Sequence, residues 1–168
     1  MTRLGRSDIS YDALRLATLS APNAGGGNSG NNAAIGNSIY VWHADGSAVD
    51  QFEPTNTGLL LAIATIRGDD TIWIPSIRIE LTAAITMPAG SSLVGINREQ
   101  SILSFTGFNG TAITLGIDAA AANLTVIFVN SSTTAYVISA TASGSVVERV
   151  TISVSGGSVF NLGIMGGT

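Results

Sequence analysis

The chain has 168 residues and a mass of 17.1 kDa, which is the size of one domain, or of one small domain with an extension. Its net charge of -4, with seven Arg and no Lys, provides no positive field for nucleic acid. With no Cys and a single His, the chain lacks thiolate ligands and cannot build a zinc site from His side chains. These values exclude a multi-domain enzyme, a nucleic-acid-binding protein and a Cys/His metal centre.

The polar residues of the chain are mostly uncharged. Only 11% of all residues are charged, whereas Gly, Ser, Thr and Asn together fill 67 of the 168 positions. These four types favour turns and hydroxyl-bearing strands over exposed helices, so the composition predicts a mostly β fold. Arg, Gly, Pro or Thr interrupts each apolar stretch before it reaches the roughly 20 residues of a membrane span, so we expect no membrane insertion.

The start of the chain predicts an attachment segment. Residues 7–19 carry apolar side chains at near-helical spacing after Ser7, which can cap a helix. Asp8, Asp12 and Arg15 interrupt this stretch, so an export signal is not expected. A local helix that packs on its own domain is the alternative. Four side chains are candidate contacts to another protein: Tyr11, Leu14, Leu16 and Leu19.

A linker is predicted next. Residues 21–37 contain five Gly and five Asn and offer almost no side chain to bury, which is typical of a linker or an extended arm. A strand is expected over residues 38–43, followed by a turn at Ala44 to Gly46. We therefore expect residues 1–54 to form an N-terminal anchoring arm or small adaptor, and residues 55–168 to form the main fold.

A short buried helix opens the second part. Thr55 or Thr57 can cap it, the run from Leu59 to Ile66 is apolar nearly all round, and Gly68 stands where a left-handed C-cap residue belongs. Four short strands separated by Pro and Gly follow, with no helix between them. Their expected ranges are 71–74, 77–81, 85–87 and 92–96.

The remaining sequence contains a quasi-repeat with a period in the low to middle twenties. Ile102, Leu124 and Val150 occupy equivalent places in the segments SILSF, NLTVIF and RVTISV. Alternating pairs recur at nearly the same spacing: Ile113/Leu115, Tyr136/Ile138 and Phe160/Leu162. A unit of this length cannot bury its own apolar face, but stacked units place like residues in columns about 4.8 Å apart. The repeat therefore predicts a β-solenoid, with Asn side chains at its left-handed corners.

The sequence from Thr57 to Leu103 resembles the entry of the pectate-lyase-like right-handed parallel β-helix superfamily. In that group a helix caps the first coil, and the patterns GDTI-x-(I/L)-P and I-x-(M/L)-P-x-G-x-x-L-x-G follow. The resemblance, over roughly residues 57–168, implies an all-β right-handed parallel β-helix with a short N-terminal capping helix. The matching positions are Gly68, Asp70, Thr71, Ile72, Ile74, Pro75, Ile85, Met87, Pro88, Gly90, Leu93 and Gly95.

Lyases and hydrolases of this superfamily carry acidic residues on adjacent coils of one face, as the resemblance implies. One repeat after Glu99 lies Ala121 or Ala122, and one repeat after Asp118 lies an uncharged stretch. The sequence therefore assigns no catalytic residue, no cofactor and no metal ligand. Asp69 and Asp70 are expected to cap a turn, and His43 is expected to reach at most Asp45.

Exposed aromatic rings are the remaining candidates for sugar contact. Trp42, Trp73 and Phe108 could form such a platform, whereas Tyr136 and Phe160 recur with the repeat and are expected in the core.

Tailspikes of the superfamily are homotrimers that attach to the phage particle through an N-terminal segment. The resemblance thus implies a virion protein that binds other tail or baseplate proteins and contacts host polysaccharide. Two alternatives stay open: the first part of a polysaccharide lyase or glycoside hydrolase, and a secreted bacterial adhesin.

Overall fold

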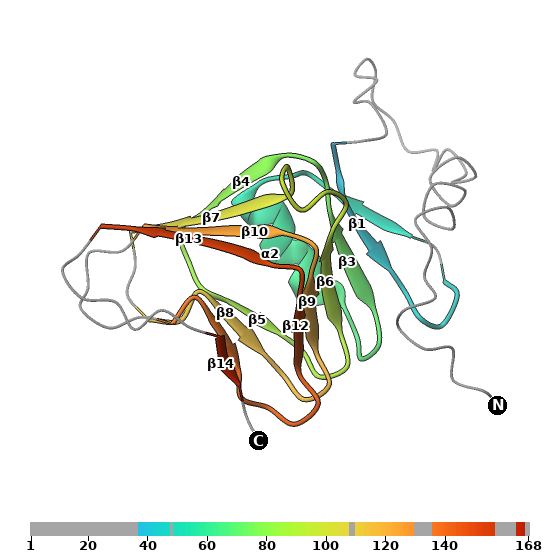
Figure 1. Cartoon of the computed structure of the whole chain (residues 1–168). Coiled ribbons are helices and arrows are strands. Elements are labelled where there is room, and N and C mark those ends of the chain that lie inside the picture. The colour runs from blue at the N-terminus through green and yellow to red at the C-terminus, as the bar shows by residue number, and fades with distance from the viewer. Residues whose placement is uncertain (1–36, 48, 108–109, 130–135, 157–163, 167–168) are drawn as a thin grey trace, which may run out of the picture. The chain divides into compact units, whose positions relative to one another are not determined.

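The computed structural model describes residues 37–47, 49–107, 110–129, 136–156 and 164–166. Within these residues the chain winds into a β-solenoid whose strands align in three sheets along the solenoid (Figure 1). Strands of successive turns pair in parallel, and one short helix accompanies them. This architecture confirms the all-β parallel solenoid that the sequence predicts.

Each turn of the solenoid contributes one strand to each sheet. The first sheet contains β3, β6, β9 and β12, the second contains β4, β7, β10 and β13, and the third contains β5, β8, β11 and β14. Short loops between consecutive strands form the corners at which the chain passes from one sheet to the next. The strands are β3 (Thr71–Ile74), β4 (Arg78–Leu81), β5 (Ile85–Met87), β6 (Ser92–Gly95), β7 (Ile102–Thr106), β8 (Ile113–Leu115), β9 (Ala120–Ala122), β10 (Thr125–Val129), β11 (Ile138–Ala140), β12 (Val146–Glu148), β13 (Thr151–Ser155) and β14 (Ile164–Gly166).

An antiparallel hairpin precedes the solenoid and extends its first sheet. Strand β1 (Ile39–Trp42) pairs with β2 (Asp50–Phe52) on one side and with β3 on the other. The β1–β3 register places Tyr40 opposite Trp73 and Val41 opposite Ile72. The hairpin therefore covers the hydrogen-bonding edge of β3 that the first turn would otherwise leave open.

Helix α2 (Asn56–Thr65) caps the interior of the first turn. Thr55 is its N-cap, and the Thr55 hydroxyl accepts a hydrogen bond from the Gly58 amide at 3.1 Å. The helix carries no charged residue, and Leu59 and Ala62 are fully buried in the core. This confirms the predicted short helix and its Thr cap. The expectation that the helix is buried is wrong, because only one side of it packs on the core, and Leu60 and Leu61 are 37% and 53% exposed.

The expected C-cap at Gly68 is wrong. The helix ends at Ile66 in extended backbone, and the residue with a left-handed backbone is Asp69, at a φ of 70°. The turn closes through the Asp70 amide, which donates to the Arg67 carbonyl at 3.2 Å. The Asp70 carboxylate in turn accepts from the Arg67 amide, so this side chain secures the turn that a glycine cap was expected to close.

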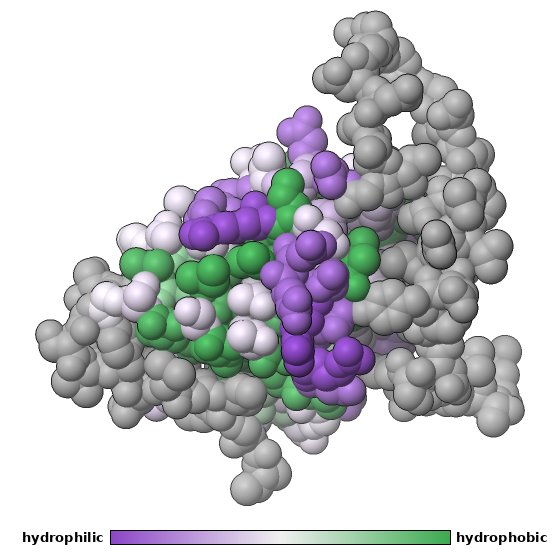
Figure 2. All heavy atoms as spheres, turned by 45° about the horizontal axis from the view of Figure 1, so that its top comes forward, coloured by the Kyte–Doolittle hydropathy of each residue, from purple (hydrophilic) through white to green (hydrophobic). Residues whose placement is uncertain are grey.

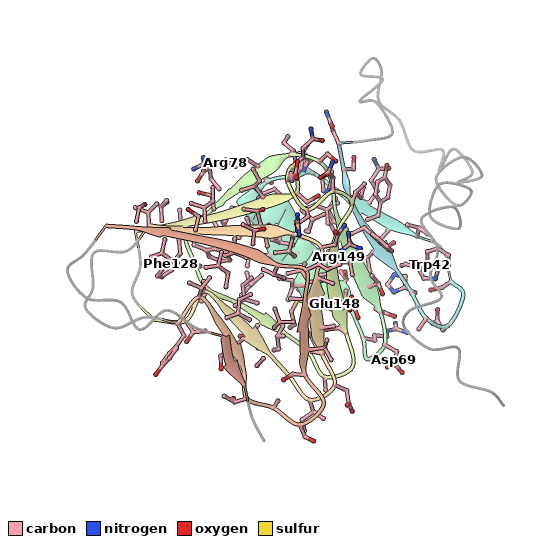
Figure 3. All side chains as sticks on the ribbon, viewed as in Figure 1. Trp42, Asp69, Arg78, Phe128, Glu148 and Arg149 are labelled. Carbon is pink, nitrogen blue, oxygen red and sulfur yellow. The ribbon has the colours of Figure 1, made fainter. Side chains whose placement is uncertain are left out.

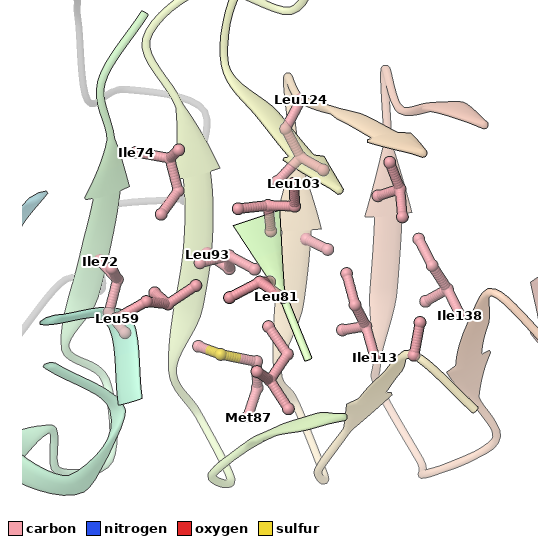
Figure 4. Close-up of a cluster of buried hydrophobic side chains, with 14 of the residues drawn as sticks. Leu59, Ile72, Ile74, Leu81, Met87, Leu93, Leu103, Ile113, Leu124 and Ile138 are labelled. Atoms are coloured by element: carbon pink, nitrogen blue, oxygen red, sulfur yellow. The ribbon is translucent and has the colours of Figure 1, made fainter. Parts of the chain in front are cut away.

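Alternating side chains of the strands fill the core in columns (Figure 4). Ile72 pairs with Leu93 in the first sheet, and Ile113 pairs with Ile138 in the third. All four side chains are fully buried. In the second sheet the inner column reads Leu81, Phe105, Phe128 and Val154. Because similar side chains stack on one another in successive turns, the core is continuous along the solenoid.

The register of the repeat differs from the one expected. Ile102 pairs with Thr125 and not with Leu124, so this column is offset by a single position and Leu103 takes the inner place. Ile113 pairs with Ile138 and not with the half-buried Tyr136. A shift of two positions leaves the same face inward, so Ile113 and Ile138 stay in the core as expected.

The last pair of the expected repeat, Phe160 and Leu162, lies outside the described residues.

Asn123 forms the corner between β9 and β10 as the sequence predicts. Its φ is 54°, and its buried side-chain amide donates to the Gly95 carbonyl at 2.7 Å. A Cβ on Gly95 would collide with the Asn123 carbonyl and with Ser101. The backbones of two successive turns therefore approach each other more closely at this corner than a side chain at Gly95 allows.

We expect Gly95→Ala to lower the free energy of unfolding by about 1–3 kcal/mol, because backbone atoms of the next turn cannot move aside. Gly68→Ala is the matched control: its Cβ would meet one carbonyl oxygen at an ordinary 3.5 Å, and its change should stay within about 1 kcal/mol. Urea denaturation of both variants measures the difference. Equal stabilities would contradict the close approach of the two turns.

Candidate functional site

Three charged side chains meet where the hairpin joins the first turn of the solenoid. His43 follows the last residue of β1, Asp50 begins β2, and Asp70 directly precedes β3. Because β1 pairs with both β2 and β3, the fold brings these three positions together from distant parts of the sequence. We call this group the His43 cluster.

Both ring nitrogens of His43 face a carboxylate. Nδ1 lies 2.8 Å from Asp70 Oδ2, and Nε2 lies 3.1 Å from Asp50 Oδ2. Asp70 also accepts hydrogen bonds from the Arg67 amide at 2.8 Å and from the Ala44 amide at 3.0 Å. The Asp70 side chain is 4% exposed and that of Asp50 is 50% exposed. The cluster therefore has a buried, fully bonded end and an end open to water.

The carboxylates shift the protonation of the cluster in opposite directions. The hydrogen bond that His43 donates to Asp70 raises the pKa of His43 above 6.5, against the opposing effect of burial, and Asp50 adds to the rise. Burial alone would raise the pKa of Asp70, but the hydrogen bonds from Arg67, Ala44 and His43 outweigh it and lower that pKa. The lowered pKa favours the anionic form of Asp70, which lies beside an imidazole that favours its charged form.

The geometry of the cluster is that of a bridge between segments. Both ring nitrogens are engaged by carboxylates, so neither is directed at a hydroxyl that it could activate as a nucleophile. The bridge links β1, β2 and the turn before β3. The expectation that His43 reaches at most Asp45 is wrong, because Asp45 accepts from the Ser47 amide while His43 turns toward Asp50 and Asp70.

We expect Asp70→Asn to lower the free energy of unfolding by about 1–3 kcal/mol, because an amide cannot accept from His43 and both backbone amides at once. The matched control is Asp69→Asn: Asp69 is exposed, and Asn tolerates its left-handed backbone, so stability should change by less than about 0.5 kcal/mol. Thermal and urea denaturation measure both variants. Loss of stability in both, or in neither, would contradict this role of Asp70.

The carboxylates on the strands are not stacked on one another. Glu80 pairs with Ser104 and Glu148 pairs with Ala122, so each strand acid faces an uncharged neighbour in the adjoining turn. Across the described ranges no group of three or more His, Cys, Asp or Glu side chains is placed to hold a metal ion.

The outward face of the second sheet is uncharged over three turns. We call the outward side chains of β7, β10 and β13 the hydroxyl face. Figure 2 shows apolar and weakly polar side chains over this part of the surface, with hydrophilic areas beside them. Arg78 and Glu80, an ion pair on β4, mark its border, and Arg78 donates to the Ser104 hydroxyl at 2.9 Å. The outward positions are Ile102, Ser104 and Thr106 on β7, Thr125, Ile127 and Val129 on β10, and Thr151, Ser153 and Ser155 on β13. Of these, Ser104 is fully buried and adds nothing to the exposed surface of the face.

Two of the three aromatic residues expected to contact sugar lie in the described part of the chain. Trp42 is half-buried at the end of β1 (Figure 3). Trp73 is only 5% exposed, and its buried indole N–H has no hydrogen-bond partner in the described part of the chain. Phe108 lies outside the described residues. The four expected anchor contacts, Tyr11, Leu14, Leu16 and Leu19, lie outside them as well.

Comparison of the chain with protein-family profiles, curated proteins and solved structures finds no match. Among the described residues no helix is long and apolar enough to cross a bilayer.

The residues that sequence reasoning missed are Asp50 and Asp70 as partners of His43. No local pattern signals this contact, because it depends on how the hairpin docks on β3.

Proposed function

We propose that the chain is a structural attachment protein of the tailspike or tail-fibre type. In this proposal residues 1–54 attach to other proteins of a phage particle, and the solenoid begins a homotrimeric shaft that carries contact with cell-surface polysaccharide. The parallel solenoid, common to tailspike-like and adhesin-like proteins, supports the proposal. So does the resemblance of residues 57–103 to the β-helix entry.

The hydroxyl face is the observation that carries the proposal. In three copies arranged around an axis along the solenoid, the side chains nearest the axis meet their own copies, so a charged side chain on a face turned toward the axis would approach its own kind. The outward positions of β7, β10 and β13 carry no charge. Ile127 is half-buried and Val129 is 38% exposed, which gives the face apolar side chains to bury against a copy.

The hydroxyl face also suits lateral packing for a geometric reason. Its three strands have equal length and pair in register, Thr125 with Ile102 and Thr151, and Ile127 with Ser104 and Ser153. A face with aligned columns lets a second copy repeat the same contact at each turn. The contact area then grows with the number of stacked turns.

We expect light scattering after gel filtration to give a particle of three times 17.1 kDa. A monomer at all accessible concentrations would contradict the homotrimeric shaft and favour an isolated enzyme domain or a monomeric adhesin. Ile127→Glu should shift the particle toward monomer, because it places an unpaired charge in the surface that the contact would bury. Thr86→Glu, an exposed position on β5 of the third sheet, is the matched control and should leave the trimer intact.

We expect no lyase activity from this chain. Incubation with acidic polysaccharides should give no unsaturated product absorbing near about 235 nm, because the strand acids of successive turns face uncharged residues. Release of such product, lost in Glu80→Gln or Glu148→Gln, would favour the enzyme alternative over the attachment function.

A further inference from the structure

We propose that His43 is a pH-dependent latch that fastens strand β2 to the first turn of the solenoid. The latch rests on the position of the imidazole between two carboxylates that belong to different segments. Asp70 stands at the start of the solenoid, and Asp50 stands at the start of β2, the outermost strand of the first sheet. The inference is independent of the proposed attachment function.

The two carboxylates distinguish the two protonation states of the ring. When both nitrogens carry protons, Nδ1 donates to Asp70 and Nε2 donates to Asp50. When the ring is neutral, the buried Asp70 anion retains the Nδ1 proton, because it accepts and cannot donate. Nε2 then presents a lone pair to the Asp50 carboxylate, and the bond to β2 is lost. Deprotonation therefore removes this side-chain bond to β2 and leaves the bond to the solenoid in place, so that β2 is held by its pairing with β1.

The charges around the ring favour this order of events. Asp50 faces it from β2, Asp70 from the turn before β3, and Asp45 acts on it from the β1–β2 turn. Arg67, from the segment after α2, is a more distant cation whose head lies 3.9 Å from the Asp45 carboxylate and is mostly exposed. The negative groups outnumber the positive one, so the cluster attracts a proton to His43.

The direction of the pH effect follows from the shifted pKa values. The pKa of His43 is raised in the folded chain, so its contribution to stability is complete below about pH 6.5 and is lost as the pH rises through the raised value. The pKa of Asp70 is lowered, so its contribution is lost only as the pH falls below about 4. The latch is therefore closed in mildly acidic solution and open in alkaline solution.

The composition makes this latch easy to observe. The chain has one His and no Cys, so His43 is its only side chain with an ordinary pKa between about 5 and 8. The N-terminal amine is the other group that titrates near this range, at about 7.7–8.0. A change confined to β2 can thus be assigned to His43 without resolving overlapping titrations of other side chains.

Hydrogen exchange followed by NMR tests the latch on the full chain. Protection factors, which correct for the intrinsic exchange rate at each pH, should fall for the amides of residues 50–52 between about pH 6 and pH 9. The amides of β6 and β7 should keep their protection over the same range. The ring nitrogen shifts of His43 should give a pKa above 6.5 and a neutral form protonated at Nδ1.

Three variants separate the latch from a general pH effect. In His43→Gln and in Asp50→Asn the fall in β2 protection should disappear, because no charged Nε2–carboxylate bond remains to be lost. Glu148→Gln removes one carboxylate from β12, which β9, β6 and β3 separate from β1 in the first sheet, and should behave like the unmodified chain. A His43 pKa at or below 6.5, or a fall in β2 protection that persists in His43→Gln, would overturn the proposal.

Discussion

The solenoid depends on one constraint: each turn must place its strands in register on the strands of the turn before. Parallel pairing satisfies the backbone between turns, and the same pairing stacks the inward side chains into columns. The constraint is most severe at the corner where Gly95 lies against the backbone of Asn123. A turn that fails to close there would displace every strand that follows it, so the corner residues are as important as the core.

The outside of the solenoid follows from the same register. Aligned strands produce aligned outward columns, and on β7, β10 and β13 of the second sheet these columns consist of Ser, Thr, Ile and Val, beside Arg78 and Glu80 on β4. Charged residues of the described ranges lie at the corner of Glu148 and Arg149 (Figure 3), beside the hairpin in the His43 cluster, and on β4, where Arg78 and Glu80 form an ion pair.

Local patterns predicted the strands well and their pairing less well. The ranges 71–74 and 85–87 agree with the structure, because alternating apolar residues end at Pro75 and Pro88. The predicted register was wrong between β7 and β10 and between β8 and β11. Ile102 and Leu103 are both apolar, and the corners differ in length, so the sequence alone did not fix which residues pair. The contact of His43 with Asp70 joins distant parts of the sequence, and only the docking of β1 on β3 creates it.

The antiparallel seam between β1 and β3 has a mechanical consequence. A force applied to the chain on the N-terminal side of Ile39 acts first on β1. The backbone pairing between β1 and β3 resists sliding of β1 along β3. The imidazole bridge to Asp70 lies at the end of this seam and shares the tension. The pairing of the hairpin with the first turn would therefore be the first contact to bear such a force. Its strength would decide whether the later turns of the solenoid stay folded.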